Sequence, residues 1–181
     1  MNRESVISFT SLAIALIAVF VTVWQGIETR EYNKNSLKPY LTAAPMLTGI
    51  EGKNGIYVTN DGVGPAFIKG AILTVNGKRF DLSRNSWPSV YEYLGLEKLC
   101  HSESWFKNGS ALKAGEKMTL LAPTAATISP RCPVEFVKLL SANQLELKIE
   151  YASVYDDSFV FQQEIGLDKQ EIATFSKLLG I

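Results

Sequence analysis

Histidine and cysteine are scarce in this chain of 181 residues, which contains one histidine and two cysteines. A structural zinc site usually needs four ligands of these types, so the chain's own histidine and cysteines are too few to form one. Excess charge of either sign is also lacking, because 18 basic side chains balance 18 acidic ones. Nucleic-acid binding depends on a positive field, so we expect no nucleic-acid partner, and no motif indicates a cofactor.

Charged residues are absent from one long stretch. Residues 5–27 contain no Asp, Glu, Lys or Arg, and fifteen of the twenty residues from Ser5 to Trp24 are apolar. Twenty helical residues extend ~30 Å, the thickness of the hydrocarbon layer of a bilayer. A cleaved secretory signal has a shorter apolar run and a more basic start than Met1-Asn2-Arg3-Glu4. We therefore predict an uncleaved transmembrane anchor at residues 1–27, with one integral span.

The orientation of this anchor is predicted from the Lys and Arg residues that flank it. Arg3 precedes the span, whereas Arg30, Lys34 and Lys38 follow it. The side with more positive charge usually stays in the cytoplasm. We expect a cytoplasmic domain, with a periplasmic domain as the alternative.

The two cysteines bear on the same question. In an oxidising compartment Cys100 and Cys132 could form a disulfide, so a periplasmic domain predicts that they are linked. In a reducing cytosol they would be free thiols or small buried apolar residues.

Small side chains recur along the predicted span at spacings of three and four residues, which places them on one stripe of a helix. This stripe is a candidate contact with another membrane helix, either of a second copy or of another protein. The alternative is the ordinary abundance of small residues in spanning helices. The stripe residues are Ser8, Ser11, Ala15, Ala18 and Thr22.

Beyond the span, a polar segment at 28–38 is compatible with a helical linker that Pro39 ends. Residues 39–181 then read as one β-rich domain. Short runs rich in β-branched and aromatic residues predict seven strands. These runs are Leu41–Leu47, Gly55–Thr59, Ala66–Val75, Arg79–Leu82, Lys117–Ala122, Leu145–Tyr151 and Ser158–Ile165.

The fold class that follows is mainly β: a transmembrane helix, then an immunoglobulin-like β-sandwich with short inserted helices and a C-terminal amphipathic helix. The inserted helices are expected at Ser89–Leu96 and Val134–Asn143. The last helix, Asp168–Leu179, has Asp168 as a candidate N-cap. Its apolar face would consist of Ile172, Phe175, Leu178 and Leu179.

Two turns separate predicted strands. Asn76-Gly77 is the pair typical of a two-residue hairpin. The second turn contains Asn60, Gly62, Gly64, Pro65 and Ala66. Its two glycines resemble the start of a dinucleotide fingerprint, but the third glycine is missing and a strand follows instead of a helix. We expect these glycines to adopt positive φ in a structural turn, with Pro65 fixing the exit into the next strand.

Other residues with chemical potential have plainer interpretations. Cys100 and His101 are neighbours, and adjacent strand side chains point to opposite faces, so they are not expected to form a nucleophile–base pair. We expect His101 in a surface loop. Asp156-Asp157, with Glu150 upstream, is expected to be a turn rather than a carboxylate site. Asn108-Gly109-Ser110 matches a glycosylation acceptor, and a turn explains it as well.

Four aromatic residues gather in the least strand-like part of the chain: Trp87, Tyr91, Tyr93 and Trp105. They predict either a lid over one end of the sandwich or a partner-binding surface.

Three stretches together resemble a widespread group of bacterial single-pass membrane proteins without an established activity. They are the stretches Asn35–Leu41, Val58–Ile68 and Leu147–Tyr155, and the second contains the Asn60-x-Gly62-x-Gly64-Pro65-Ala66 turn. The resemblance implies an architecture and a bacterial inner-membrane location, and it assigns no catalytic residues.

The sequence thus supports three functional hypotheses. The first is a membrane-anchored binding module without catalytic activity of its own. The second is an accessory or structural subunit of a larger membrane complex, with the small-residue stripe as its contact. The third is an enzyme that uses Cys100 as nucleophile.

Overall fold

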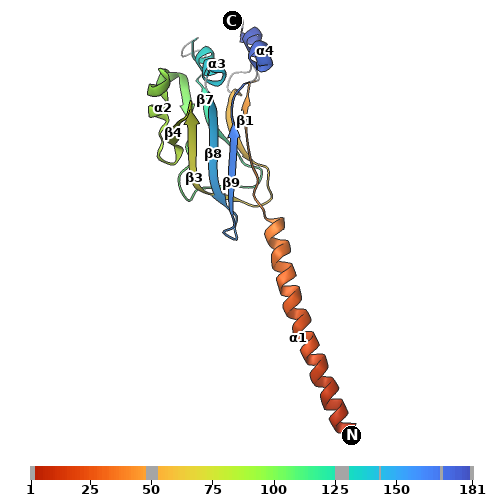
Figure 1. Ribbon diagram of the computed structural model, residues 1–181. Coiled ribbons are helices and arrows are strands. Elements are labelled where there is room, and N and C mark those ends of the chain that lie inside the picture. The colour runs from red at the N-terminus through yellow and green to blue at the C-terminus, as the bar shows by residue number, and fades with distance from the viewer. Residues whose placement is uncertain (1–2, 48–52, 125–130, 143, 168, 180–181) are drawn as a thin grey trace. The chain divides into compact units, whose positions relative to one another are not determined.

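The computed structural model describes residues 3–47, 53–124, 131–142, 144–167 and 169–179 (Figure 1). The chain divides into two compact units at the boundary between Leu37 and Lys38. The first unit consists of one helix, and the second is a sheet-rich domain.

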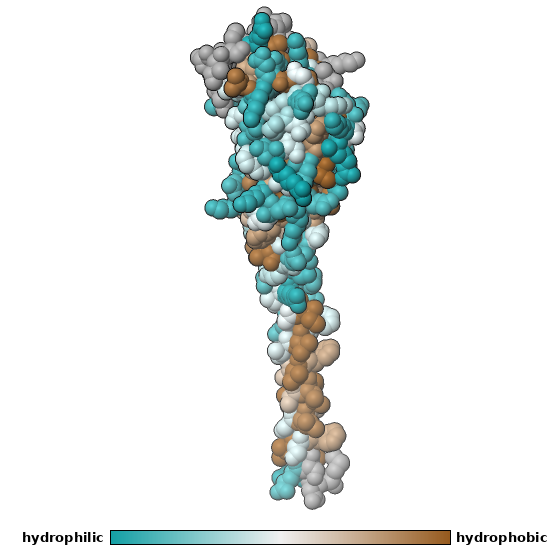
Figure 2. Space-filling model, turned by 90° about the vertical axis from the view of Figure 1, so that its left-hand side faces the viewer, coloured by the Kyte–Doolittle hydropathy of each residue, from teal (hydrophilic) through white to brown (hydrophobic). Residues whose placement is uncertain are grey.

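Helix α1 runs from Arg3 to Ser36 without interruption, through both the apolar run and the polar segment after it. At ~1.5 Å per residue, its 34 residues extend about 50 Å. Its apolar side chains are exposed, and brown apolar surface follows the helix in Figure 2. This helix is long and apolar enough to span a membrane. It ends three residues before Pro39, as the sequence predicts.

The domain contains two antiparallel sheets, consistent with a β-sandwich. The first sheet has the order β1-β2-β7-β5 and the second the order β4-β3-β8-β9, with the short β6 beside β3. The strands of the first sheet are β1 (Leu41–Met46), β2 (Gly55–Asn60), β7 (Lys117–Pro123) and β5 (His101–Glu103). Those of the second are β4 (Lys78–Asp81), β3 (Ala66–Val75), β8 (Leu145–Ala152), β9 (Ser158–Glu164) and β6 (Ala111–Leu112).

Alternating side chains build the core between the two sheets. In β8, Leu145, Leu147 and Ile149 are buried. Lys148 and Glu150, at the alternate positions, face outward. Successive side chains of a strand point to opposite faces, so this alternation gives the sheet one buried and one solvated face.

Short helices lie between the strands and after the last strand. They are η1 (Leu82–Arg84), α2 (Trp87–Leu94), η2 (Lys98–Cys100), α3 (Cys132–Ala142) and α4 (Lys169–Leu179). Trp87 of α2 and Leu139 of α3 meet Ile56 and Leu73 from the two sheets around one small apolar cavity. Helices α2 and α3 therefore cover part of the core that the sheets leave open (Figure 1).

All seven predicted strands are confirmed, with ends within one residue of those expected. The inserted helices are also present, and each begins two residues earlier than predicted. Strands β5 and β6 were not predicted, because segments of three and two residues are too short for an alternating pattern. The predicted N-cap Asp168 lies outside the described residues.

The Asn76-Gly77 turn joins β3 and β4 as a two-residue hairpin, with Val75 paired to Lys78. Both turn residues have positive φ, 49° for Asn76 and 81° for Gly77. This is the type I′ geometry that suits the twist of the flanking strands, and it confirms the prediction.

The second turn is organised by the buried side chain of Asn60 at the end of β2. Its Oδ1 accepts hydrogen bonds from the backbone N–H groups of Tyr40 and Gly62, each at 3.1 Å. Its Nδ2 donates to the carbonyl oxygens of Gly64 at 2.8 Å and Leu112 at 2.9 Å. The amide thus uses its full capacity of two donors and two acceptors, and it joins β1, the turn and β6.

Gly62 fills a different role from the predicted one. Neither Gly62 nor Gly64 is among the glycines with positive φ in the described residues, so that expectation was wrong. A Cβ at Gly62 would instead lie 2.3 Å from the backbone nitrogen of Tyr40. Glycine is needed here because two backbone segments approach each other closely.

We predict that Asn60→Ala lowers the free energy of unfolding of the full chain by roughly 3–5 kcal/mol. The substitution leaves two N–H groups and two carbonyls without their partner in a buried site, and each such group costs about 1–3 kcal/mol when it stays unpaired. Urea unfolding in detergent measures the change. Asn108→Ala, at an exposed position, is the matched control and should change stability by less than about 0.5 kcal/mol. Equal stability of the two variants would contradict this role of Asn60.

Candidate functional site at the disulfide-bonded end of the sandwich

A disulfide joins Cys100, the last residue of η2, to Cys132, the first residue of α3. Both residues are fully buried, and 32 positions separate them in the sequence. Strands β5, β6 and β7 lie inside the loop that the bond closes. The structure thus brings together the two cysteines whose pairing the sequence tied to an oxidising compartment.

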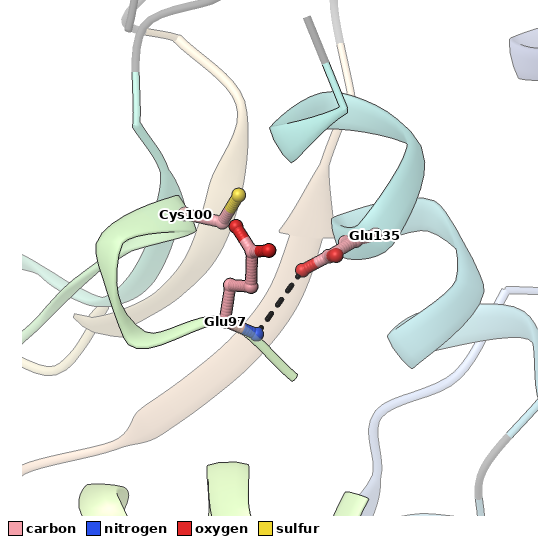
Figure 3. Close-up of side chains that lie close together, drawn as sticks. All are labelled: Glu97, Cys100 and Glu135. Atoms are coloured by element: carbon pink, nitrogen blue, oxygen red, sulfur yellow. Dashed lines mark hydrogen bonds between the residues drawn. The ribbon is translucent and has the colours of Figure 1, made fainter. Parts of the chain in front are cut away.

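Two carboxylates lie next to the disulfide (Figure 3). A carboxylate oxygen of Glu97, a carboxylate oxygen of Glu135 and Cys100 Sγ all lie within 4.8 Å of one another. The backbone N–H of Glu97 donates to Glu135 Oε2 at 3.3 Å. Each glutamate lies three residues from a cysteine, Glu97 before Cys100 and Glu135 after Cys132, so this spacing could have indicated the cluster from the sequence.

As a metal site this cluster is incomplete. Zinc binds thiolates, and the sulfur of Cys100 is bonded to Cys132. The remaining two carboxylates are fewer oxygen ligands than calcium takes. In its disulfide form the cluster therefore lacks a ligand set typical of either ion.

His101 starts β5 and is only 7% exposed, so its prediction as a surface loop residue was wrong. Its ring stacks on Tyr91 of α2, with centroids 5.1 Å apart, and Phe136 of α3 lies against it at 6.4 Å. These aromatic neighbours come from elements distant in the sequence, and they bury a residue that has no local apolar pattern.

The hydrogen bonding of His101 fixes its tautomer. Nδ1 lies 3.1 Å from the carbonyl oxygen of Glu97, which can only accept, so Nδ1 carries the proton. Nε2 is buried and has no hydrogen-bond partner among the residues that the structure describes. Burial lowers the pKa of His101, although the Glu97 carbonyl and the charges of Glu135 and Glu103 act in the opposite direction. The ring is therefore neutral at pH 7.

Tyr91 donates its hydroxyl hydrogen to Glu103 Oε2 at 2.6 Å. Burial and the adjacent carboxylate raise the pKa of Tyr91, so the phenol stays protonated. Among the described residues at this end of the domain, His101 is neutral, Tyr91 is protonated and the Cys100 sulfur is bonded to Cys132. The arrangement stabilises the packing of α2, β5 and α3.

The four aromatic residues differ in burial. Trp87 and Tyr91 are buried, and Trp87 Nε1 donates to the carbonyl of Ser104 at 2.8 Å. Tyr93 and Trp105 remain 41% and 45% exposed. The lid prediction is correct for the first two residues and wrong for the last two. Tyr93 is exposed because α2 turns only one of its faces toward the core, and Trp105 lies outside α2, in the segment after β5.

The remaining sequence candidates lie apart from this site. Asp156 has a φ of 63° in the β8–β9 turn and pairs with Lys69 at 3.2 Å, which confirms the turn. Glu150 is on β8 and pairs with Lys148 at 2.6 Å, so it does not join a carboxylate pair with Asp156. Asn108 is exposed in a turn that ends at Gly109, where φ is 81°.

The small-residue stripe lies on α1, where its members Ser8, Ser11, Ala15, Ala18 and Thr22 are exposed. The Thr22 hydroxyl donates to the carbonyl of Ala18 at 2.8 Å. This bond lies within the helix, so the Thr22 hydroxyl is satisfied without a second helix.

We predict that reduction of the disulfide lowers the free energy of unfolding by about 3–4 kcal/mol, the chain-entropy value for a closed loop of this length. The thermal midpoint of the full chain in detergent should fall by roughly 10 °C when a reductant is added. The double variant Cys100→Ser/Cys132→Ser is the control, and its midpoint should not respond to reductant. An unchanged midpoint in the native protein would contradict the stabilising role.

A second prediction concerns the pH dependence of stability. The pKa of His101 is lower in the folded than in the unfolded state, so below about pH 6.5 the unfolded chain binds a proton that the folded chain does not. Stability should therefore decrease as the pH falls from 6.5 towards the folded-state pKa, by up to about 1.4 kcal/mol per pH unit. His101→Phe keeps a ring on Tyr91 and should reduce this slope. Urea unfolding of both proteins from pH 7.5 to 5 measures it, and equal slopes would refute the prediction.

Comparison of the chain with protein-family models, with curated proteins and with solved structures finds no match.

Proposed function

We propose that this protein is a single-pass membrane protein whose β-sandwich domain works by binding a partner, without catalytic activity of its own. The observation that carries the proposal is the contrast between the two units. The side chains of α1 are exposed along the apolar run, whereas the domain has its own core and disulfide. A helix that is apolar all round is stable in lipid and not in water.

The binding role is supported by the chemistry of the disulfide-bonded end. An enzyme with Cys100 as nucleophile needs a thiolate, and the disulfide removes it. The adjacent His101 uses Nδ1 for a backbone carbonyl. Anchoring would also aid a binding function, because confinement to a membrane raises the effective concentration of domain and partner.

We further propose that the domain lies on the oxidising side of the membrane, which in a bacterial inner membrane is the periplasm. The Cys100–Cys132 disulfide supports this side, since such bonds are rare in a reducing cytosol. The Lys and Arg count favours the opposite side, but by only three residues against one. We give the disulfide more weight, because the fold places both cysteines together in the core.

The location is tested by fusing two reporters to the C-terminus in separate strains. Alkaline phosphatase is active only in the periplasm. Green fluorescent protein fluoresces only when the fusion leaves it in the cytosol. We expect an active phosphatase and a dark fluorescent fusion. A non-reducing gel of the native protein should show faster migration than the Cys100→Ser/Cys132→Ser control. The opposite reporter result would place the domain in the cytosol.

The binding role is tested by a span exchange. Two proteins are compared: the native chain and a variant in which residues 6–27 are replaced by an unrelated apolar span. Each is chemically crosslinked in intact membranes and then purified under denaturing conditions. We expect the same crosslinked partner with both, because the domain makes the contact. Loss of the partner after the exchange would favour the accessory-subunit alternative, in which the exposed small-residue stripe makes the contact. Absence of any partner would contradict the binding role.

A further inference from the structure

Strand β9 is an edge of the second sheet. Its residues pair with β8 in continuous register, from Ser158 opposite Ala152 to Glu164 opposite Glu146. Within the part of the chain that the structure describes, no strand pairs with its other side. We propose that this free edge accepts an extended segment of another protein as an additional strand. The inference rests on the proposed binding function and names the class of partner.

The direction of the β9 backbone follows from one hydrogen bond. The N–H of Ile165 donates to the carbonyl of Leu145 at 2.6 Å. In an antiparallel pair the bonded residues alternate, so Phe161 and Gln163 also face β8. The N–H and C=O groups of Val160, Gln162 and Glu164 therefore point towards the free edge, where a further strand would bond.

The other edges of the two sheets carry features that hinder strand addition, and β9 carries none of them. Strand β1 contains Pro45, which lacks an N–H group. Strand β4 is four residues long and carries Lys78 and Arg79, and β5 has only three residues. The sequence of β9, Ser158–Glu164, has neither proline nor a basic residue. It is longer than β1, β4 and β5, and its pairing with β8 is regular along its length.

One end of β9 is less accessible than the other. Strand β1 of the first sheet comes close to β9. Lys38 Nζ, just before β1, lies 5.2 Å from the ring centroid of Phe159, close to the start of β9. The stretch from Val160 to Glu164 lies beyond this contact, and Val160 is 59% exposed. The free stretch thus offers three outward-facing backbone positions at alternate residues.

Charge indicates which side chains the partner brings. Glu164 lies directly opposite Glu146 on β8, and like charges in opposed positions destabilise a sheet. Gln162 Nε2 donates to Glu146 Oε1 at 2.5 Å, while Lys148 is paired with Glu150 instead. A hollow of about 300 Å³ beside the two glutamates, lined also by Thr74 and Gly77, leaves room for a basic head group.

The expected partner segment is therefore extended, with an apolar side chain beside Val160 and a Lys or Arg four residues away beside Glu164. Four residues along a strand return to the same face, so both contacts lie on the outer side of the sheet. A second copy of this chain fits less well, because its own β9 would bring another glutamate and no basic residue to the edge.

Site-specific photocrosslinking tests the proposal in the full chain in native membranes. The probe is benzoylphenylalanine, placed at Val160 or at Glu164, with Arg79 on the β4 edge as the control position. Mass spectrometry then locates the crosslinked residues. We expect the probes at Val160 and Glu164 to reach positions about four residues apart in one segment of one protein, with a basic residue at the position beside Glu164. The probe at Arg79 should not reach that segment.

A pair of substitutions separates backbone from side-chain effects. With the probe at Val160, Gln162→Pro removes an edge N–H without removing a backbone hydrogen bond to β8, and crosslinking should decrease at least tenfold. The side-chain bond from Gln162 to Glu146 is lost in this variant and in its alanine control alike. Gln162→Ala removes the same side chain, keeps the N–H and should retain the crosslink. The disulfide-dependent shift on a non-reducing gel shows whether the proline variant folds. If the proline variant does not fold, the proposal is tested by the spacing of the crosslinks mapped from Val160 and Glu164.

Four results would overturn the proposal: no crosslink, crosslinks to a second copy, crosslinks scattered without register, or a crosslink that survives Gln162→Pro in the folded protein. A partner that persists in the span exchange but does not crosslink to β9 would refute this inference alone. Absence of a partner in both experiments would also refute the binding function.

Discussion

The domain depends on the buried amide of Asn60. Its four hydrogen bonds hold the start of β1, the turn after β2 and the carbonyl of Leu112 in β6. Strands β1 and β2 belong to one sheet and β6 to the other, so a single side chain links the two sheets at one end of the sandwich. Gly62 permits this arrangement, because any side chain there would collide with the backbone beside Tyr40. The Asn-x-Gly-x-Gly-Pro-Ala pattern therefore has a structural explanation that needs no ligand.

The opposite end of the first sheet is held by covalent chemistry. Strand β7 starts opposite Thr59, near Asn60, and ends at Pro123 opposite His101. The disulfide between Cys100 and Cys132 ties this end to α3. Polar side chains are buried at both ends, but their hydrogen bonding differs. Asn60 has all its partners, whereas His101 Nε2 has none within the described part of the chain. The Asn60 end contains no titrating group in this network, so its contribution to stability does not depend on pH. The His101 end loses stability when the histidine is protonated.

Two physical arguments about the compartment disagree in this protein. The count of Lys and Arg residues flanking α1 is an argument about how a spanning helix is inserted, and its margin is small. The disulfide acts in the folded domain and requires an oxidant in its surroundings. The proposed placement on the oxidising side means that the segment proposed to add to β9 belongs to an exported protein.

Local patterns in the sequence determined the membrane-length helix, the seven longer strands and the Asn76-Gly77 hairpin. Each of these depends on residues that are close in the chain: an uncharged run, alternation with period two, or a pair that tolerates positive φ. Only the tertiary structure decided the rest, because it depends on contacts between distant segments. His101 is buried by Tyr91 and Phe136, Asn60 is satisfied by Tyr40 and Leu112, and Glu97 meets Glu135 through the pairing of two cysteines 32 positions apart. The free edge of β9 belongs to the same class, since a strand's position at the border of a sheet depends on which strands pair and not on its own residues.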